Sequence, residues 1–124
     1  MRRLGLIATF GLLAAAPSGA GGPWHVTGDV AGHGFVLDCT FSQSGAQLAG
    51  ACVEAGGSDS HVKPGKVHKL SEGSVAGSAI RWAYPVSVML LPIDIRFDGT
   101  ASGNRMTGTV SAAGRKGSFT AVRT

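Results

Sequence analysis

The chain has 124 residues, of which 44% are hydrophobic and 15% charged, and its formal net charge is +4. This length fits one domain with a modest core and excludes a second one. Arg2 and Arg3 lie at the extreme amino terminus, so the rest of the chain carries four minus two charges, or +2. The mildly basic stretch around Lys63, Lys66 and Lys69 is typical of a solvated loop. We therefore expect no nucleic-acid partner, which would require a clustered basic face.

Residues 1–20 have the pattern of a secretory signal peptide. A positive start at Arg2 and Arg3 precedes an apolar run over residues 4–16 and a small-residue ending, Ser18-Gly19-Ala20. The alternative is an uncleaved membrane anchor, but the run is shorter than the roughly twenty residues that span a bilayer. We expect cleavage near Ala20 and a single domain over residues 21–124, secreted or periplasmic in a bacterium, with no later membrane segment.

Alternating apolar and polar residues predict strands through most of the remaining chain. The alternating segments are residues 24–30, 35–41, 48–52, 80–88, 93–97, 106–110 and 119–121. Turn signals lie at residues 31–34, 42–45, 54–59, 98–99, 102–104 and 113–114. Almost no segment combines helical spacing with start and stop signals. The pattern predicts an all-β, up-and-down antiparallel meander of about eight strands that closes into a small barrel.

The two cysteines, Cys39 and Cys52, flank a predicted hairpin. Cys39 shares the apolar face of its strand with Phe41, and Cys52 shares that of the partner strand with Leu48. In an oxidising compartment this geometry favours a disulfide inside the core. A metal pair lacks further ligands at suitable spacing, and a redox pair is usually C-x-x-C, so both alternatives are weaker.

Glycines recur inside the predicted strands, as in "MTGTV" at residues 106–110. The repeated positions are Gly28, Gly50, Gly108 and, more loosely, Gly77. Such a repeated pattern indicates either a ligand site or a requirement of the fold. A small barrel bends its strands sharply, and glycine neither resists the bend nor crowds the interior. We therefore interpret them as structural glycines.

The segment "PVSVMLLPID" is consecutively apolar from Val88 through Met89 and Leu90 to Leu91, where a polar connection is expected. As a hairpin tip it would expose adaptable apolar side chains at the barrel mouth, as a ligand portal or docking edge does. The alternative, which we favour from the sequence, is a plug over the barrel end or a strand buried on both faces.

Three segments share a rhythm of strand, short turn and a strand of the form apolar-x-Gly-x-Val. They are "GFVLDCTFSQSGAQLAGACV", "EGSVAGSAIRWAYP" and "IDIRFDGTASGNRMTGTVSAAGRKGSFTAVR", and the last ends on Gly-x-Phe-x-Ala-x-Arg at residues 117–123. In this rhythm the chain resembles small secreted bacterial β-barrel proteins that are calycin-like (lipocalin-like) and largely uncharacterised. The resemblance implies the barrel architecture over most of the chain. It implies no functional residues, because the group has no settled activity, and the cysteine pair and "SVMLLP" depart from it.

No residue pattern indicates catalysis, a cofactor or a metal site. His25, His33, His61 and His68 do not have zinc-site spacing, and G-x-S-x-G and P-loop motifs are missing. Without partners in the sequence, each histidine is expected at the surface or in a loop. A weak hydrolase would need two carboxylates, or a histidine and a nucleophile, that meet only in space.

We therefore expect a non-enzymatic, monomeric binding module for a small apolar ligand in the barrel or at its mouth. The candidate ligand-binding residues are Trp24, Trp82, Tyr84, Val88, Met89, Leu90 and Leu91. The alternative is a protein-interaction or protease-inhibitor-like module that captures an exported protein through its loops or its flexible amino-terminal end, residues 21–23. Biotin binding of the avidin type is not expected, because only two tryptophans are present.

Overall fold

The computed structural model describes residues 19–57 and 63–124. The regular elements in this part of the chain are all β-strands, as the alternation predicts. They are β1 (Gly22–Val30), β2 (His33–Ser44), β3 (Gln47–Gly57), β4 (Val67–Lys69), β5 (Glu72–Ala76), β6 (Ala79–Val88), β7 (Leu91–Ser102), β8 (Arg105–Ala112) and β9 (Arg115–Arg123). Within the described ranges, no helix has the length and apolarity needed to cross a bilayer. Most of the expected signal peptide, residues 1–18, lies outside the described residues.

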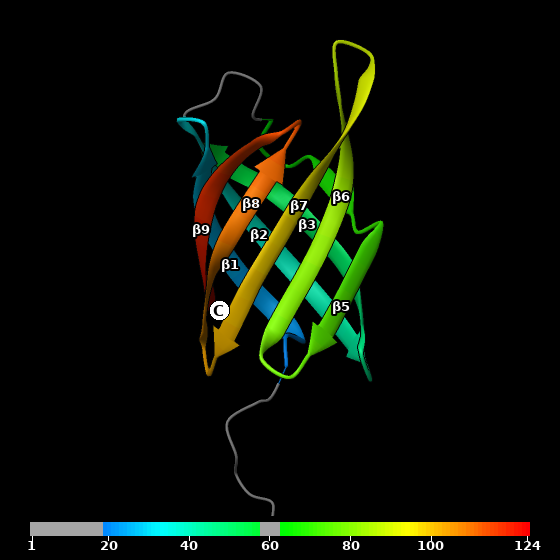
Figure 1. The fold of residues 1–124 in the computed structure, drawn as a ribbon, viewed down its shortest axis with the longest axis vertical. Helices are drawn as coiled ribbons and strands as arrows, with labels where there is room; N and C mark the ends of the chain where they lie inside the picture. The colour runs from blue at the N-terminus through cyan, green and yellow to red at the C-terminus, as the bar shows by residue number, and fades with distance from the viewer. Residues whose placement is uncertain (1–18, 58–62) are drawn as a thin grey trace, which may run out of the picture.

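Eight of the nine strands form a closed ring. Neighbouring strands pair in the order β2-β1-β9-β8-β7-β6-β5-β3, and β2 pairs with β3 to close the barrel (Figure 1). The pairings are antiparallel, and β4 pairs with β3 beside this ring. The predicted fold, a closed antiparallel barrel of about eight strands, is confirmed.

The disulfide is also confirmed. Cys39 in β2 lies directly opposite Cys52 in β3, and the two are bonded. Both side chains are buried in the core beside Leu37 and Phe41. The bond thus joins the two strands that close the ring.

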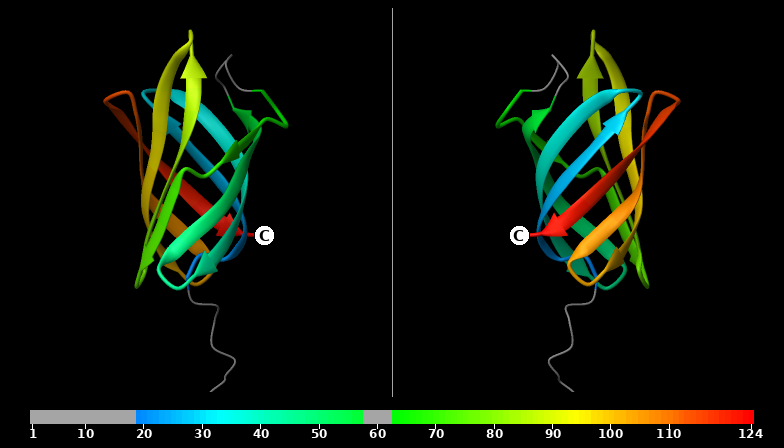
Figure 2. Two further views of the ribbon diagram at one scale, coloured as in Figure 1. Left: turned by 90° about the vertical axis from the view of Figure 1, so that its right-hand side faces the viewer. Right: turned by 90° about the vertical axis from the view of Figure 1, so that its left-hand side faces the viewer.

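The two ends of the barrel use different hairpin turns. The end that carries the β1–β2, β6–β7 and β8–β9 turns is called the mouth here, and the opposite end is called the base (Figure 2). Each mouth turn has positive φ at both central residues, which is typical of type I′ turns; the pairs are Ala31-Gly32, Met89-Leu90 and Ala113-Gly114. Each base turn has positive φ at its first residue, which is a glycine: Gly45, Gly77 or Gly103. Gly77 is therefore a turn residue, and the loose assignment of Gly77 to a strand is wrong.

Two further turn predictions are wrong. Asp98-Gly99 lies inside β7, because the glycine serves packing: a Cβ at Gly99 would come within 2.8 Å of the Phe119 ring and 2.9 Å of the Thr107 carbonyl oxygen. The turn expected at residues 54–59 begins later, since β3 continues to Gly57; residues 58–62, which include His61, lie outside the described residues.

Gly108 lies opposite Gly99 across β7 and β8. A Cβ on Gly108 would overlap the carbonyl oxygen of Asp98 and would lie 2.5 Å from the Gly99 Cα. Neighbouring backbone also approaches Gly28 and Gly50 too closely for a side chain. The mid-strand glycines therefore allow close strand approach in the barrel wall.

The amino-terminal segment closes the base. Ala20 is fully buried, its carbonyl accepts a hydrogen bond from Trp24 Nε1 at 2.9 Å, and its N–H donates to Gln43 Oε1 at 2.9 Å. The Arg123 guanidinium lies 4.3 Å from the Trp24 ring centroid and donates to the Gly21 carbonyl. Gly22 and Pro23 belong to β1. The expectation of a flexible end at residues 21–23 is therefore wrong.

Candidate functional site: a cavity below the barrel mouth

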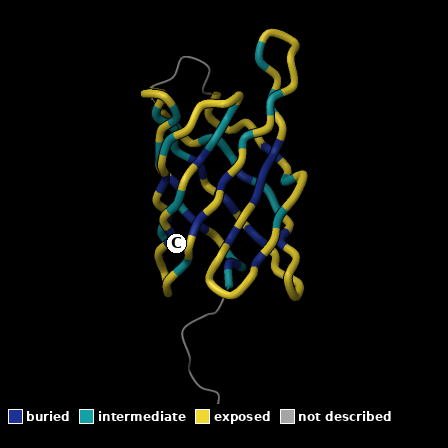
Figure 3. The backbone as a smooth tube through the Cα atoms, in the orientation of Figure 1, coloured by how far each residue is buried: buried dark blue, intermediate teal, exposed yellow. Residues whose placement is uncertain are grey.

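Aromatic rings fill the lower interior and form a floor across the barrel. Trp82 stacks on Phe97 with centroids 4.6 Å apart and 9° between the planes. Phe119 packs edge-on against Phe97 at 5.4 Å, and Phe41 lies 4.9 Å from Trp82. These residues are almost completely buried. Buried and exposed positions alternate along the strands of the barrel (Figure 3). The base half therefore has a packed aromatic core.

Above this floor the barrel contains a cavity of about 550 Å³, which is called the chamber below. Strands on all sides contribute its walls, and most of the lining is apolar. The main apolar side chains are Phe35, Leu37, Val86, Ile95, Phe97 and Val110. The volume lies within the range of roughly 300–1,000 Å³ that is typical of small-molecule sites. The inward-facing side chains therefore fill the base half of the barrel and line a cavity in the half toward the mouth.

Polar groups line the cavity on one side, around Glu54 and His68. Glu54 Oε2 and His68 Nε2 form a hydrogen bond, and both side chains are largely buried. The His68 ring in turn stacks on Tyr84 at 4.6 Å. Burial and, to a lesser extent, the Glu54 charge raise the pKa of Tyr84, so its phenol stays neutral and can donate a hydrogen bond at physiological pH.

The carboxylate of Glu54 also holds the chain that enters β4. Its Oε1 accepts the Lys63 backbone N–H at 2.7 Å, and the Glu54 backbone pairs with Lys66 and Gly65 at 2.9 and 2.7 Å. Lys63 and Lys66 are thereby positioned at the mouth, where they line the cavity with Arg115. The apolar chamber thus has a cationic rim.

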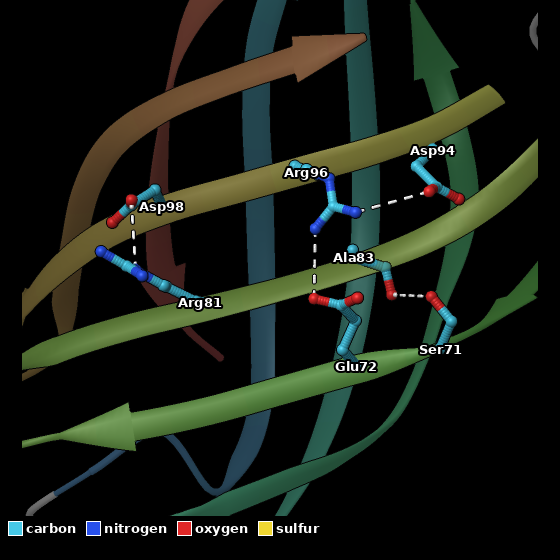
Figure 4. A network of polar contacts seen from close by, with 7 residues as sticks. All are labelled: Ser71, Glu72, Arg81, Ala83, Asp94, Arg96 and Asp98. Carbon is cyan, nitrogen blue, oxygen red and sulfur yellow. Dashed lines mark hydrogen bonds and ion pairs between the residues drawn. The ribbon is translucent and has the colours of Figure 1, made fainter.

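A second hollow of about 350 Å³ lies against β5, β6 and β7. On the outer face of these strands Arg81 pairs with Asp98 at 3.2 Å, and Arg96 pairs with Glu72 at 3.1 Å and Asp94 at 3.5 Å (Figure 4). These side chains are more than half exposed, so the ion pairs contribute little stability. The apolar chamber below the mouth remains the better candidate for a ligand.

The structure separates the residues expected at the ligand site. Tyr84 and Val88 line the cavity, whereas Trp24 and Trp82 lie in the packed base. Met89, Leu90 and Leu91 form an exposed hairpin tip, with 89%, 96% and 65% of their surface accessible. The plug or buried strand favoured from the sequence is therefore wrong, because two consecutive positive φ angles turn the chain at Met89 and Leu90.

The sequence reasoning missed the Glu54–His68 pair. Extending the alternation of Leu48 and Cys52 by two residues places Glu54 on the inner face, so this signal was present. His68 lies in a strand of three residues, too short for a periodicity. The expectation that each histidine lies at the surface or in a loop is wrong for His68, which is buried in β4. His25 lies in β1 with a partly exposed side chain, and its Nδ1 is 2.8 Å from the Asp38 carboxylate. No group of three potential metal ligands occurs in residues 19–57 and 63–124.

No family model matches the chain, and no curated protein is significantly similar to it. Among solved structures, the chain is similar to a redesigned β barrel, mFAP1, bound to DFHBI. That likeness has a TM-score of 0.60 at 19% sequence identity, and it covers 83% of this chain and 94% of the other. It shows the fold alone, a closed β barrel, which is the architecture that the resemblance noted in the sequence implies.

Proposed function

We propose that the protein binds a small, mainly apolar molecule in the chamber between the Trp82–Phe97 floor and the mouth. The observation that carries this proposal is the cavity of about 550 Å³ with predominantly apolar walls. An unfilled chamber of this size forfeits packing contacts, and a bound apolar molecule restores them. The redesigned barrel bound to DFHBI supports the proposal, because it is a barrel of similar fold that binds a small molecule.

The polar groups of the chamber suit a ligand with one polar end. The cations Lys63, Lys66 and Arg115 line the chamber at its rim, and the neutral Tyr84 phenol lines its wall beside His68. A few fixed polar groups in an apolar site orient a ligand. We infer that the apolar part of the ligand faces Phe97 and that its polar end faces the rim. Binding rather than catalysis is proposed.

The test is a titration with the neutral fluorescent probe N-phenyl-1-naphthylamine. Val86→Phe adds a ring inside the chamber, whereas Val67→Phe makes the same change at a residue that is 61% exposed and does not line it. We expect saturable binding to the wild type and to Val67→Phe, and affinity at least about tenfold lower for Val86→Phe. Equal binding by all three proteins, with unchanged melting temperatures, would contradict the proposal.

We also propose that the protein acts after export. The signal-peptide pattern of residues 1–20 supports this, and the Cys39–Cys52 disulfide is the kind of bond that persists in oxidising compartments. The second hypothesis is capture of an exported protein partner through loops. No contact within residues 19–57 and 63–124 favours it over ligand binding.

A further inference from the structure

The β6–β7 hairpin projects beyond the other turns at the mouth (Figures 1 and 2). Its tip consists of Met89 and Leu90, followed by Leu91 and Pro92. Three large apolar side chains are exposed together there, at the end of the molecule where the chamber opens. A convex apolar tip has the shape for insertion into an apolar phase, whereas a groove would receive a partner.

The backbone of this tip is unfavourable for its residues. The other two mouth turns place glycine second, at Gly32 and Gly114, where φ is positive. The β6–β7 turn has the same pattern of positive φ but places Leu90 there, with φ of 69°. A bulky residue in this region is strained, and Asn-Gly would be the favoured pair. Stability therefore does not explain Met89-Leu90, and strain retained at an exposed tip indicates a function.

Basic side chains accompany the tip at the same end. Lys63 and Lys66 follow β3, and Arg115 and Lys116 begin β9. Among the described residues, none of these four side chains pairs with a carboxylate within 4.0 Å. Of the described carboxylates nearby, Glu54 already bonds His68, and Asp29 lies near the β1–β2 turn. Among the described residues, the mouth therefore combines an apolar projection with excess positive charge.

We propose that the mouth docks on an anionic lipid bilayer. The side chains of Met89, Leu90 and Leu91 enter the interfacial layer, and Lys63, Lys66, Arg115 and Lys116 contact lipid phosphates. Apolar insertion beside a basic surface is the combination that anionic bilayers bind. This docking is independent of whether the chamber holds a ligand, and it would bring the chamber opening to the lipid surface.

The test is co-sedimentation of the purified protein with vesicles of phosphatidylcholine, with or without phosphatidylglycerol. The double variant Met89→Asn, Leu90→Gly installs the favoured turn, so it should be at least as stable as the wild type. Its partitioning onto anionic vesicles should fall by roughly tenfold or more, because two inserting side chains are lost. Ala113→Asn is the matched control, since it makes Asn-Gly in the neighbouring mouth turn and should bind as the wild type does.

The charge contribution needs its own pair of variants. Lys66→Ala with Arg115→Ala should weaken binding to phosphatidylglycerol vesicles by roughly tenfold, whereas Arg105→Ala at the base should have little effect. Failure of the wild type to sediment with anionic vesicles would overturn the proposal and assign the tip to a protein partner. Undiminished binding by the Asn-Gly tip variant would overturn it as well.

Discussion

The imidazole of His68 stacks on the phenol ring of Tyr84, with centroids 4.6 Å apart and 12° between the planes. His68 belongs to β4 and Tyr84 to β6, two strands that do not pair within the described residues. The ring contact therefore joins two strands of the wall that are not neighbours in the sheet. A hydrogen bond between Glu54 Oε2 and the Nε2 atom of His68 holds the imidazole in this position.

His68→Ala should remove both the stack and the partner of the largely buried Glu54 carboxylate. We expect a loss of about 1–3 kcal/mol in the free energy of unfolding, measured by urea denaturation. Adding Glu54→Gln should cost less in the His68→Ala background than alone, because the orphaned charge is then neutralised. Additive losses in this double-mutant cycle would show that the pair does not act as a unit.

Tyr84 should make stability depend on alkaline pH. Burial raises its pKa in the folded protein, so the unfolded chain loses this proton first as the pH rises above the usual value of about 10. The free energy of unfolding should therefore be unaffected below that pH and should fall above it. The chain has one tyrosine, so the ultraviolet absorbance of tyrosinate reports this group alone. Tyr84→Phe should reduce the alkaline loss, and a normal tyrosinate titration in the folded protein would contradict the burial of the phenol.

Gly108→Val should destabilise the fold by several kcal/mol, because the new side chain overlaps the backbone of β7. The same strand supplies the control: Thr109→Val changes an exposed position and should shift stability by no more than about 0.5 kcal/mol. Thermal unfolding followed by circular dichroism measures both. A Gly108→Val protein that kept its melting temperature but lost ligand binding would mean that the glycine serves the site rather than the architecture.

Replacing both Cys39 and Cys52 by alanine should lower the free energy of unfolding by about 3 kcal/mol, since the bond closes a short loop of the unfolded chain. Denaturation of the oxidised and reduced wild type should show a similar difference. Coincident unfolding curves would indicate that the pairing of β2 with β3 alone fixes the ring closure.

The expected signal peptide gives a prediction about the amino terminus. Protein recovered from the cell exterior or the periplasm should begin near Gly21, as determined by intact mass and amino-terminal sequencing. Cleavage after Ala20 would remove the carbonyl that accepts the Trp24 indole N–H, so the Trp24 fluorescence should differ between the precursor and the processed chain. Recovery of only the intact precursor would contradict the export proposal.

The architecture could be predicted from the sequence because alternation, turn glycines and cysteine placement are local signals. Trp24 and Val26, Cys39 and Phe41, and Phe119 and Ala121 all face inward as their spacing predicts. The division of the interior into packed base and hollow chamber could not be predicted, because alternation says which side chains face inward but not how completely they fill the space. For this reason the sequence predicts the same ligand-binding role for Trp82 and Tyr84, two residues apart in β6, although one is part of the floor and the other lines the chamber.

The turn between β6 and β7 could not be predicted for a different reason. Met89-Leu90 lacks the glycine of the other mouth turns, so the segment is typical of a continuing buried strand. Pairing of Val88 with Leu91 across the turn shows that β6 and β7 nevertheless form a tight hairpin. Strand pairing imposed the turn against the local preference of its residues, which only the structure could reveal.

Native mass spectrometry of protein purified from its natural source tests the central claim, ligand binding in the chamber, most directly. The account predicts a bound small molecule on the wild type and on Val67→Phe, released on unfolding, and its loss or strong depletion in a folded Val86→Phe variant. A wild-type protein that carries no added mass and also fails to take up an added apolar probe would contradict the account.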